Sequence, residues 1–482
     1  MSLFIKKPLE QLMAGAGDSD TGLKRTLGVG NLIALGIGAI IGAGLFVRTA
    51  AAAGEAAGPA VVVSFIIAAI GCAFAGLCYA EFASMIPIAG SAYAYAYVTM
   101  GEFMAWIIGW ALVLEYALAS ATVSIAWSEY LNNLLGGAIP YQWSHSPFET
   151  SLNGVSGIIN FPALFILVIL TMILIKGTKE SANLNAIIVF IKVAIVLLFI
   201  ALGWGFINEA NYTPFMIPET MPGHEDWNTH GWGGVLGGAG IVFFAFIGFD
   251  AVSTAAQEAK NPKRDMPIGI LGSLVVCTIL YILFGHVLTG VAPWTDFVDP
   301  EKGREASVAY AISTYMTGYG WLATAVTVAI LAGFSSVILV MLMGQSRIFY
   351  SMSKDGLLPK AFGDLHPKYQ TPYKSNWILF VFVGLFAAFV PGSVAGDLTS
   401  FGTLFAFVLV SLGIWILRRK SPEMERPFKT PLVPLVPILG AVICLAMIFA
   451  LDMQTLKVAF IWMIVGLFVY FLYSKKTSKL NK

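Results

Sequence analysis

The chain has 482 residues, of which 58% are hydrophobic and 11% are charged, and its mean hydropathy is +0.80. This composition excludes a soluble domain with a polar surface and indicates a protein that crosses a membrane many times, with lipids around it. The formal net charge of +1 points to no charged partner, and no nucleic acid is expected to bind.

Apolar segments recur along the whole chain, and about 20 apolar residues are needed to cross the hydrocarbon of a bilayer as a helix. The polar residues 1–27 lack an early apolar stretch followed by a small-residue cleavage site, so no cleaved signal peptide is predicted. Twelve spans are predicted, at residues 31–52, 60–85, 103–131, 159–176, 183–207, 234–257, 268–292, 320–346, 375–391, 397–418, 431–451 and 456–474.

Lysine and arginine crowd alternate connections between these spans. The other connections hold only Arg48, Lys302, Arg304 and Lys457. Positive residues accumulate on the cytoplasmic side of membrane proteins, which predicts that both termini are cytoplasmic. An even number of spans agrees, and the expected location is the cell membrane.

The first span is rich in glycine, with four glycines among residues 36–44. The sixth span is also interrupted by glycine, in G-G-A-G-I-V-F-F-A-F-I-G-F-D (237–250), and it follows the first by five spans. Interrupted helices at corresponding positions of two halves are typical of transporters with inverted repeats. Close helix packing is an alternative role for Gly38 and Gly42, whose spacing fits a small-xxx-small motif.

A broken membrane helix exposes backbone groups that a small zwitterion can bind. A half-helix that begins in mid-membrane presents free N–H groups and a positive dipole end to a carboxylate. A half-helix that ends there presents free carbonyls to an ammonium group. Since an α-amino acid carries both groups, the two breaks predict an amino acid site.

Five motifs in this order resemble the amino acid–polyamine–organocation family, and within it the bacterial relatives of the cationic amino acid transporters. They are G-A-I-I-G-A-G-L-F (38–46), Y-A-E-F-A-S-M-I-P-I-A-G-S-A-Y (79–93), F-F-A-F-I-G-F-D (243–250), E-A-K-N-P-K-R-D-M-P (258–267) and G-Q-S-R-I-F-Y-S-M-S-K-D-G-L-L-P (344–359).

The resemblance implies an all-α polytopic membrane protein of 12 transmembrane helices, with a LeuT-type 5+5 inverted repeat plus two C-terminal helices and alternating access. The chain would divide into a cytoplasmic tail (1–27), a first repeat with spans 1–5 (28–207), a second repeat with spans 6–10 (208–419), spans 11–12 (420–474) and a cytoplasmic tail (475–482).

The resemblance also places the substrate site at the two breaks. The implied groups are the amides of Ala43 and Gly44 for the carboxylate, the carbonyls of Ile40, Phe244 and Ile247 for the ammonium, and the ring of Phe246 over the site. Position 43 is often Thr or Ser in relatives, so Ala43 removes a hydroxyl that would hydrogen-bond the carboxylate.

Three Asp, Glu or Lys residues lie well inside predicted spans, far from the span ends, where a charge is costly: Lys192, Glu115 and Asp250. Lys192 lies about 15 Å into the fifth span, deeper than a lysine easily reaches back to the interface. The resemblance places its amine where sodium-coupled relatives hold sodium, which suggests proton coupling. Glu115 and Asp250 match the acidic positions of the cationic-transporter branch.

Alternatives stay open for these residues. The three could neutralise one another as static contacts in the bundle, and Glu115 could face either a cationic substrate side chain or the proton path. The predicted function is therefore secondary active uptake of cationic or small neutral L-amino acids, proton-coupled through Lys192, Glu115 and Asp250. An amino acid exchanger without net proton flux is the alternative.

Other functional classes find little support in the sequence. The four cysteines lie in apolar spans without ligand spacing, and the five histidines form no H-E-x-x-H motif, so neither a metal site nor a cofactor is predicted. No nucleophile with a neighbouring base indicates an enzyme, and no ring of polar pore-lining residues indicates a channel. No G-x-x-x-x-G-K-[ST] motif indicates an ATP-driven pump. A small partner helix and the oligomeric state cannot be predicted.

Three further segments are predicted to have structural roles. Tyr93, Tyr95 and Tyr97 alternate in the sequence and suggest an aromatic belt at the membrane interface. The segment 347–359 and the turn N-P-K-R-D-M-P suggest interfacial anchors or the salt bridges of a gate.

Overall fold

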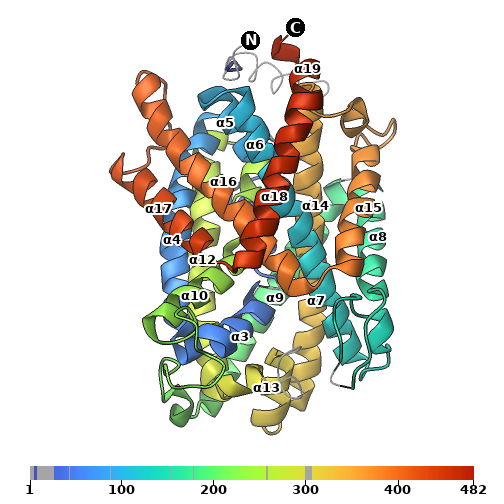
Figure 1. Ribbon diagram of the computed structural model, residues 1–482, viewed down its shortest axis with the longest axis vertical. Coiled ribbons are helices and arrows are strands. Elements are labelled where there is room, and N and C mark those ends of the chain that lie inside the picture. The colour runs from blue at the N-terminus through green and yellow to red at the C-terminus, as the bar shows by residue number, and fades with distance from the viewer. Residues whose placement is uncertain are drawn as a thin grey trace.

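A computed structural model describes residues 5–7, 27–42, 44–86, 88, 90–151, 153–176, 178–256, 259–298 and 307–481. These residues form helices without any strand (Figure 1). The longer helices are α2 (Val29–Ile40), α4 (Val61–Met85), α5 (Ser91–Thr99), α6 (Glu102–Leu112), α7 (Leu118–Leu134), α8 (Phe161–Lys176), α9 (Thr178–Gly203), α10 (Gly231–Phe243), α12 (Pro262–Val291), α13 (Ser307–Tyr315), α14 (Gly320–Lys354), α15 (Tyr373–Phe389), α16 (Gly392–Lys420), α17 (Leu435–Phe449) and α18 (Met453–Val469).

Both termini lie at the same end of the bundle, here called the termini end (Figure 1). The connections around η5 (Tyr141–Trp143), η7 (Glu209–Tyr212) and α13 lie at the opposite end, here called the loop end. The shared end agrees with the even number of predicted spans.

The helices match the predicted spans in position. Eight helical runs among the described residues are long and apolar enough to cross a membrane, and Gly44–Met85 joins two predicted spans into one run. Of four shorter apolar helices, α2 forms the start of the first predicted span, and α8, α15 and α17 lie where further spans are predicted. The chain is therefore a polytopic helical membrane protein, while the number of twelve crossings stays a prediction.

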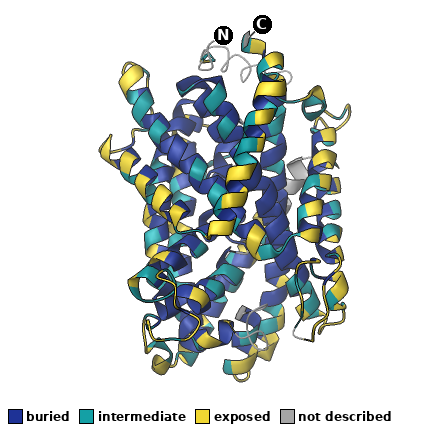
Figure 2. Ribbon diagram, in the orientation of Figure 1, coloured by how far each residue is buried: buried dark blue, intermediate teal, exposed yellow. Residues whose placement is uncertain are grey.

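Burial separates interior from peripheral helices (Figure 2). In α7, most residues are buried, whereas α18 buries only Thr455, Ala459 and Gly466. The exposed hydrophobic side chains of α18 include Phe460, Ile461 and Phe468. Such outward apolar faces are expected where lipid is the solvent.

The predicted aromatic belt is wrong. Tyr93, Tyr95 and Tyr97 lie on the short helix α5 and are each only 1% exposed. Tyr95 stacks on Phe82, with ring centroids 4.8 Å apart. Alternation in sequence gave no sign of this, because α5 is covered on all sides by its neighbours.

A buried carboxylate ties α4 to the termini end of α16. Glu81 is fully buried, and its oxygens accept hydrogen bonds from Arg418 Nε at 3.0 Å and Arg418 Nη2 at 2.7 Å. The amide of Thr430 also donates to Glu81, at 2.7 Å. Separating such a buried pair would leave an uncompensated charge in the interior, which is costly. The contact therefore holds the two helices against each other.

Candidate functional site

The first helical run breaks in mid-bundle, as predicted. Helix α2 ends at Ile40, Ile41 has an extended backbone, and a π-helix η1 (Gly44–Arg48) follows. It continues through α3 (Thr49–Ala52), η2 (Ala53–Ala57) and η3 (Gly58–Ala60) into α4. The last carbonyls of a helix have no partner within it, so this break leaves carbonyls exposed in the bundle interior.

Lys192 caps this break. Its Nζ donates to the carbonyl of Gly38 at 2.6 Å and to that of Ile41 at 2.9 Å. The side chain is fully buried, and its stem passes Gly333 of α14. The amine of Lys192 therefore lies at the negative dipole end of α2, where a positive charge is favourable.

Tyr281, on α12, links the two breaks. Its hydroxyl lies 3.0 Å from the carbonyl oxygen of Ile40 and 2.8 Å from that of Ala245, in hydrogen-bonding geometry with both. One buried tyrosine thus contacts exposed carbonyls of the first and the sixth spans. This role could not be predicted from the sequence, because Tyr281 lies in an ordinary apolar span.

The second break follows α10. The short helix η8 (Phe244–Phe246) ends at Ile247, whose backbone is extended, and α11 (Ala251–Thr254) begins after Asp250. Gly248 has φ +110°, a conformation that favours glycine. A Cβ at Gly44 would overlap Ala245 Cα and lie 2.7 Å from its nitrogen, so the two broken runs touch backbone to backbone.

A small cavity lies between the two breaks. Its volume is about 10 Å³, close to the minimum needed for one water molecule. An amino acid does not fit in this space. The lining residues are Ala39, Ile40, Gly42, Gly44, Ala119, Val123, Phe244, Ile247, Val337 and Met341.

Four of the predicted substrate-site residues meet at this cavity: Ile40, Gly44, Phe244 and Ile247. Ala43 lies outside the described residues. Phe246 does not line the cavity, since its ring packs on Tyr281 with centroids 5.3 Å apart. Glu115 does not line it either.

Six lining residues were not predicted as site residues. Ala39 and Gly42 lie at the first break itself, and the other four lie on two further helices. Ala119 and Val123 are four residues apart on α7, and Val337 and Met341 are four residues apart on α14. Such pairs share one helix face. The faces of these largely buried helices cannot be ranked from sequence, since apolar residues surround them on every side.

The two buried carboxyl groups, of Glu115 and Asp250, lie close to each other. Glu115, within η4 (Val113–Ala117), neighbours Asp250 and Thr403, and both acids are fully buried. Tyr116 donates to Asp250 Oδ2 at 2.5 Å. Two ionised carboxylates this close would repel each other strongly in a low dielectric.

Mutual neutralisation of Lys192, Glu115 and Asp250 is not what the structure shows. The ammonium of Lys192 contacts backbone carbonyls, and neither carboxyl group is among its hydrogen-bond partners. The lysine and the acid pair are therefore separate elements of the site.

A family model described as amino acid permease matches residues 27–471. The chain belongs to the amino acid permease family. It is a transporter of the amino acid–polyamine–organocation family, as its motifs indicated. It is 43% identical to the branched-chain amino acid permease BcaP of Bacillus subtilis, over 100% of this chain and 99% of that protein.

Two other relatives show how widely this family varies. The permease is 42% identical to the methylthioribose transporter of Bacillus subtilis, over 100% of both chains. It is 33% identical to cationic amino acid transporter 4 of Homo sapiens, over 89% of this chain and 65% of that protein. The three relatives carry different substrate classes in their names, so family membership alone leaves the side-chain preference of this permease open.

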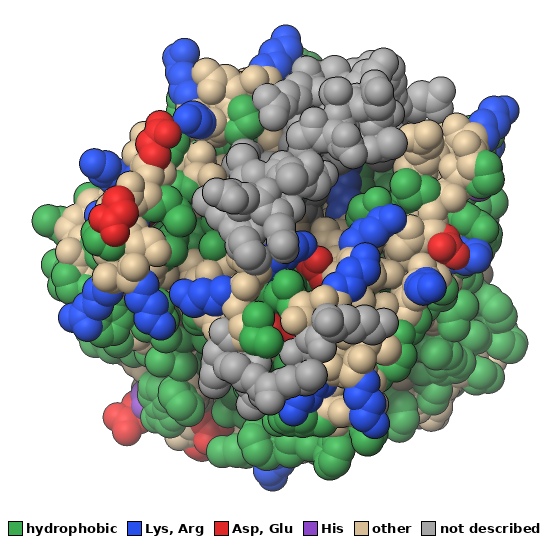
Figure 3. Space-filling view, turned by 90° about the horizontal axis from the view of Figure 1, so that it is seen from above, with side chains coloured by type: hydrophobic (Ala, Val, Ile, Leu, Met, Phe, Trp, Pro, Cys, Tyr) green, Lys and Arg blue, Asp and Glu red, His purple; other side chains and the backbone are tan. Residues whose placement is uncertain are grey.

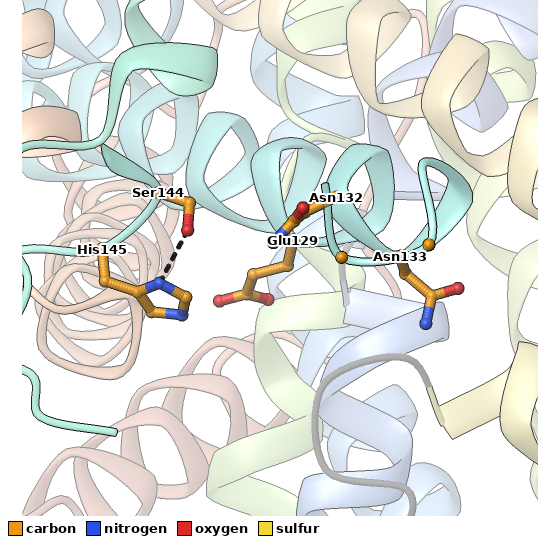
Figure 4. A pocket seen from close by; sticks show the side chains of 7 residues that line it. Glu129, Asn132, Asn133, Ser144 and His145 are labelled. Carbon is orange, nitrogen blue, oxygen red and sulfur yellow. Dashed lines mark hydrogen bonds between the residues drawn. The ribbon is translucent and has the colours of Figure 1, made fainter. Parts of the chain in front are cut away.

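A larger cavity lies at the loop end of the permease, near the end of α7 (Figure 4). Its volume is about 220 Å³, and Glu129, Asn132, Ser144 and His145 are among its lining residues. Tyr141 stacks on His145 in the same loop. This cavity holds no part of either helix break, so the smaller central cavity is the better candidate for the substrate site.

Proposed function

We propose that this permease takes up small neutral aliphatic L-amino acids together with protons across the cell membrane. The observation that carries the proposal is the meeting of two broken helices, one of them capped by the buried ammonium of Lys192. Amino acid exchange without net proton flux is the second candidate, and the same broken helices would serve it.

The backbone at the breaks suits the α-carboxylate and α-ammonium groups of a substrate. The run that restarts at Gly44 points the positive dipole end of a helix at the break, which suits a carboxylate. The amides of Leu45 and Phe46 now donate to the Gly42 carbonyl, at 3.1 and 3.4 Å, and a substrate carboxylate would compete for them. The carbonyls of Ile40, Phe244 and Ile247 suit an ammonium, with Tyr281 giving up its contact with Ile40 when the substrate binds. Ala43 would offer its amide and no hydroxyl, as predicted from the sequence.

The cavity lining favours an apolar substrate side chain. Ala119, Val123, Val337 and Met341 supply apolar surface, and none of the lining residues is charged. A cationic side chain would lose its hydration there without a counter-charge, at a cost of several kcal/mol. Glu115 would offer that counter-charge only if the site opened toward it. The similarity to the branched-chain amino acid permease BcaP also supports a substrate with an aliphatic side chain.

We also propose the fold of a LeuT-type 5+5 inverted repeat, with repeats at 28–207 and 208–419, further helices at 420–474 and twelve crossings. The helix breaks after α2 and after α10, five predicted spans apart, support this assignment. The termini end would be cytoplasmic, and Figure 3 shows lysine and arginine side chains distributed around it.

Two ion pairs would close the two sides of the site during alternating access. Toward the loop end, Arg48 of η1 contacts Asp397 of α16 at 2.7 Å. At the termini end, Lys7 contacts Asp355, just after α14, at 2.6 Å. Both pairs are formed here, which agrees with the small volume of the central cavity. Opening toward either side would require one pair to separate.

A substrate panel tests the proposed function. Purified permease in liposomes should accumulate leucine, isoleucine or valine more than lysine or arginine, because the cavity lining is uncharged. Uptake of each radiolabelled amino acid, and of methylthioribose, is measured with the outside more acidic than the inside. Accumulation of methylthioribose without any amino acid would contradict the proposal.

A substitution can distinguish the two proposed roles of Glu115, in the proton path or in contact with the substrate side chain. If Glu115 belongs to the proton path, Glu115→Gln should reduce pH-driven uptake of leucine and of lysine by similar factors. Binding of each amino acid is measured by thermal shift in the same variant, with Glu209→Gln, an exposed residue at the loop end, as control. A loss of affinity confined to lysine and arginine would assign Glu115 to the substrate side chain instead.

A further inference from the structure

The C-terminal segment of the chain is bound to the end of α14. Helix α14 ends at Lys354, and its last carbonyls have no partner within the helix. Three successive carbonyls beyond that end accept hydrogen bonds from residues 474–480, here called the C-terminal strap: Asp355 from Lys479 N at 3.1 Å, Gly356 from Thr477 Oγ1 at 2.7 Å and Leu357 from Ser474 Oγ at 2.8 Å.

The end of α14 is shaped to fit this strap. Gly356 has φ +82°, which favours glycine. A Cβ at Gly356 would overlap the carbonyl oxygen of Thr477 and lie 3.3 Å from Lys479 N. The close approach of the two backbones therefore depends on the absence of a side chain at this position.

The strap is also anchored to the start of α6. Glu102 is 2% exposed, and its carboxylate accepts hydrogen bonds from Tyr97 at 2.9 Å, from Tyr470 at 3.2 Å and from Ser478. Ser478 is fully buried. Hydrogen bonds to a buried charge are stronger than those between neutral groups, so Ser478 is held firmly against α6.

The N-terminal segment meets the same two acidic residues. The Glu102 amide donates to the carbonyl of Ile5 at 3.0 Å. Lys7 donates to Asp355 Oδ1 at 2.6 Å, and Tyr93 donates to Asp355 Oδ2 at 2.8 Å. The backbone held by the strap therefore carries the carboxylate that closes the termini end.

We propose that the C-terminal strap is an intramolecular latch that holds the termini end closed by fixing Asp355 opposite Lys7. While the strap is bound, the backbone at Asp355 cannot shift, and the ion pair keeps its geometry. Release of the strap frees this backbone and lowers the cost of separating Lys7 from Asp355. The proposal rests on the proposed function in that the termini end must open during transport.

Thiol accessibility tests the latch. Ser253, on α11, is fully buried and lies on the termini side of the second break. Its hydroxyl oxygen is 3.0 Å from the hydroxyl oxygen of Ser91. Ser253→Cys therefore reports opening toward the termini end through its reaction with a water-soluble maleimide. The four native cysteines are buried and give a low background.

The test compares strap variants in the Ser253→Cys background, using the full chain. The double variant Thr477→Val, Ser478→Ala removes two hydroxyl donors. We expect the loss of their two hydrogen bonds to make labelling of the introduced thiol roughly tenfold faster. Ser474→Ala should act in the same direction. The matched control is Lys476→Ala, since Lys476 is an exposed neighbour in the same turn. This variant should not change the labelling rate of the thiol at position 253.

The outcomes separate the latch from the proposed function, because labelling needs no substrate. Labelling rates within twofold of the parent in both strap variants would overturn the latch, even if the parent transports amino acids. Faster labelling in a protein that transports no amino acid would support the latch and overturn the proposed function. If the native cysteines of the double variant also react, its fold is damaged and Ser474→Ala decides.

Discussion

Lys192→Ala is expected to abolish pH-driven amino acid accumulation in liposomes. The substitution removes the charge that bonds the carbonyls of Gly38 and Ile41 and leaves the end of α2 without its cap. Each hydrogen bond to a charged group contributes about 1.5–3 kcal/mol, so the coupling between protonation and the geometry of the break should be lost. Accumulation is measured with the outside more acidic and without sodium.

Two controls isolate the charge of Lys192. Lys192→Met keeps most of the apolar stem beside Gly333 and should lose accumulation to the same degree as Lys192→Ala. Lys457→Ala removes an exposed lysine on α18 and should accumulate substrate like the wild type. Unchanged accumulation by both Lys192 variants, or uptake that requires a sodium gradient, would reject this mechanism. Counterflow by the wild type that does not depend on pH would favour the exchanger.

Gly44→Val is expected to abolish substrate binding, and Gly44→Ala should already reduce it by a factor of about ten or more, the equivalent of about 1.4 kcal/mol. A Cβ at this position would crowd a carboxylate held by the amides of Ala43 and Gly44. The structure adds that a Cβ at Gly44 meets the backbone of Ala245 first, at 2.7 Å from its nitrogen. Overpacking of this kind costs about 1–3 kcal/mol, and here it would push the two broken runs apart.

Binding is measured by thermal shift and by equilibrium binding of radiolabelled leucine. Gly240→Ala is the matched control, because a Cβ at this buried position of α10 would meet no atom within 4 Å. It should bind leucine as the wild type does. Wild-type affinity in Gly44→Ala would show that the two runs separate without cost, and the proposed site would then be wrong.

The sequence by itself determined the features that depend on local composition. Membrane spans, the helix breaks around Gly42 and Gly248 and the isolated lysine at position 192 follow from hydropathy and residue type over short windows. The motifs further indicated the family. The close approach of Gly38 to Val189 and of Gly42 to Val337 also shows that small residues at this break serve packing as well as unwinding.

Only the tertiary structure decided which distant residues meet. Tyr281 reaches both breaks, Met341 lines the cavity and Glu115 lies beside Asp250 because several helices cross at one point. In a bundle whose spans are apolar on every face, periodicity does not tell which face points inward. Tyr97 and Ser478 illustrate the same limit: both looked peripheral, yet both bind the buried carboxylate of Glu102, because the chain ends fold back over it.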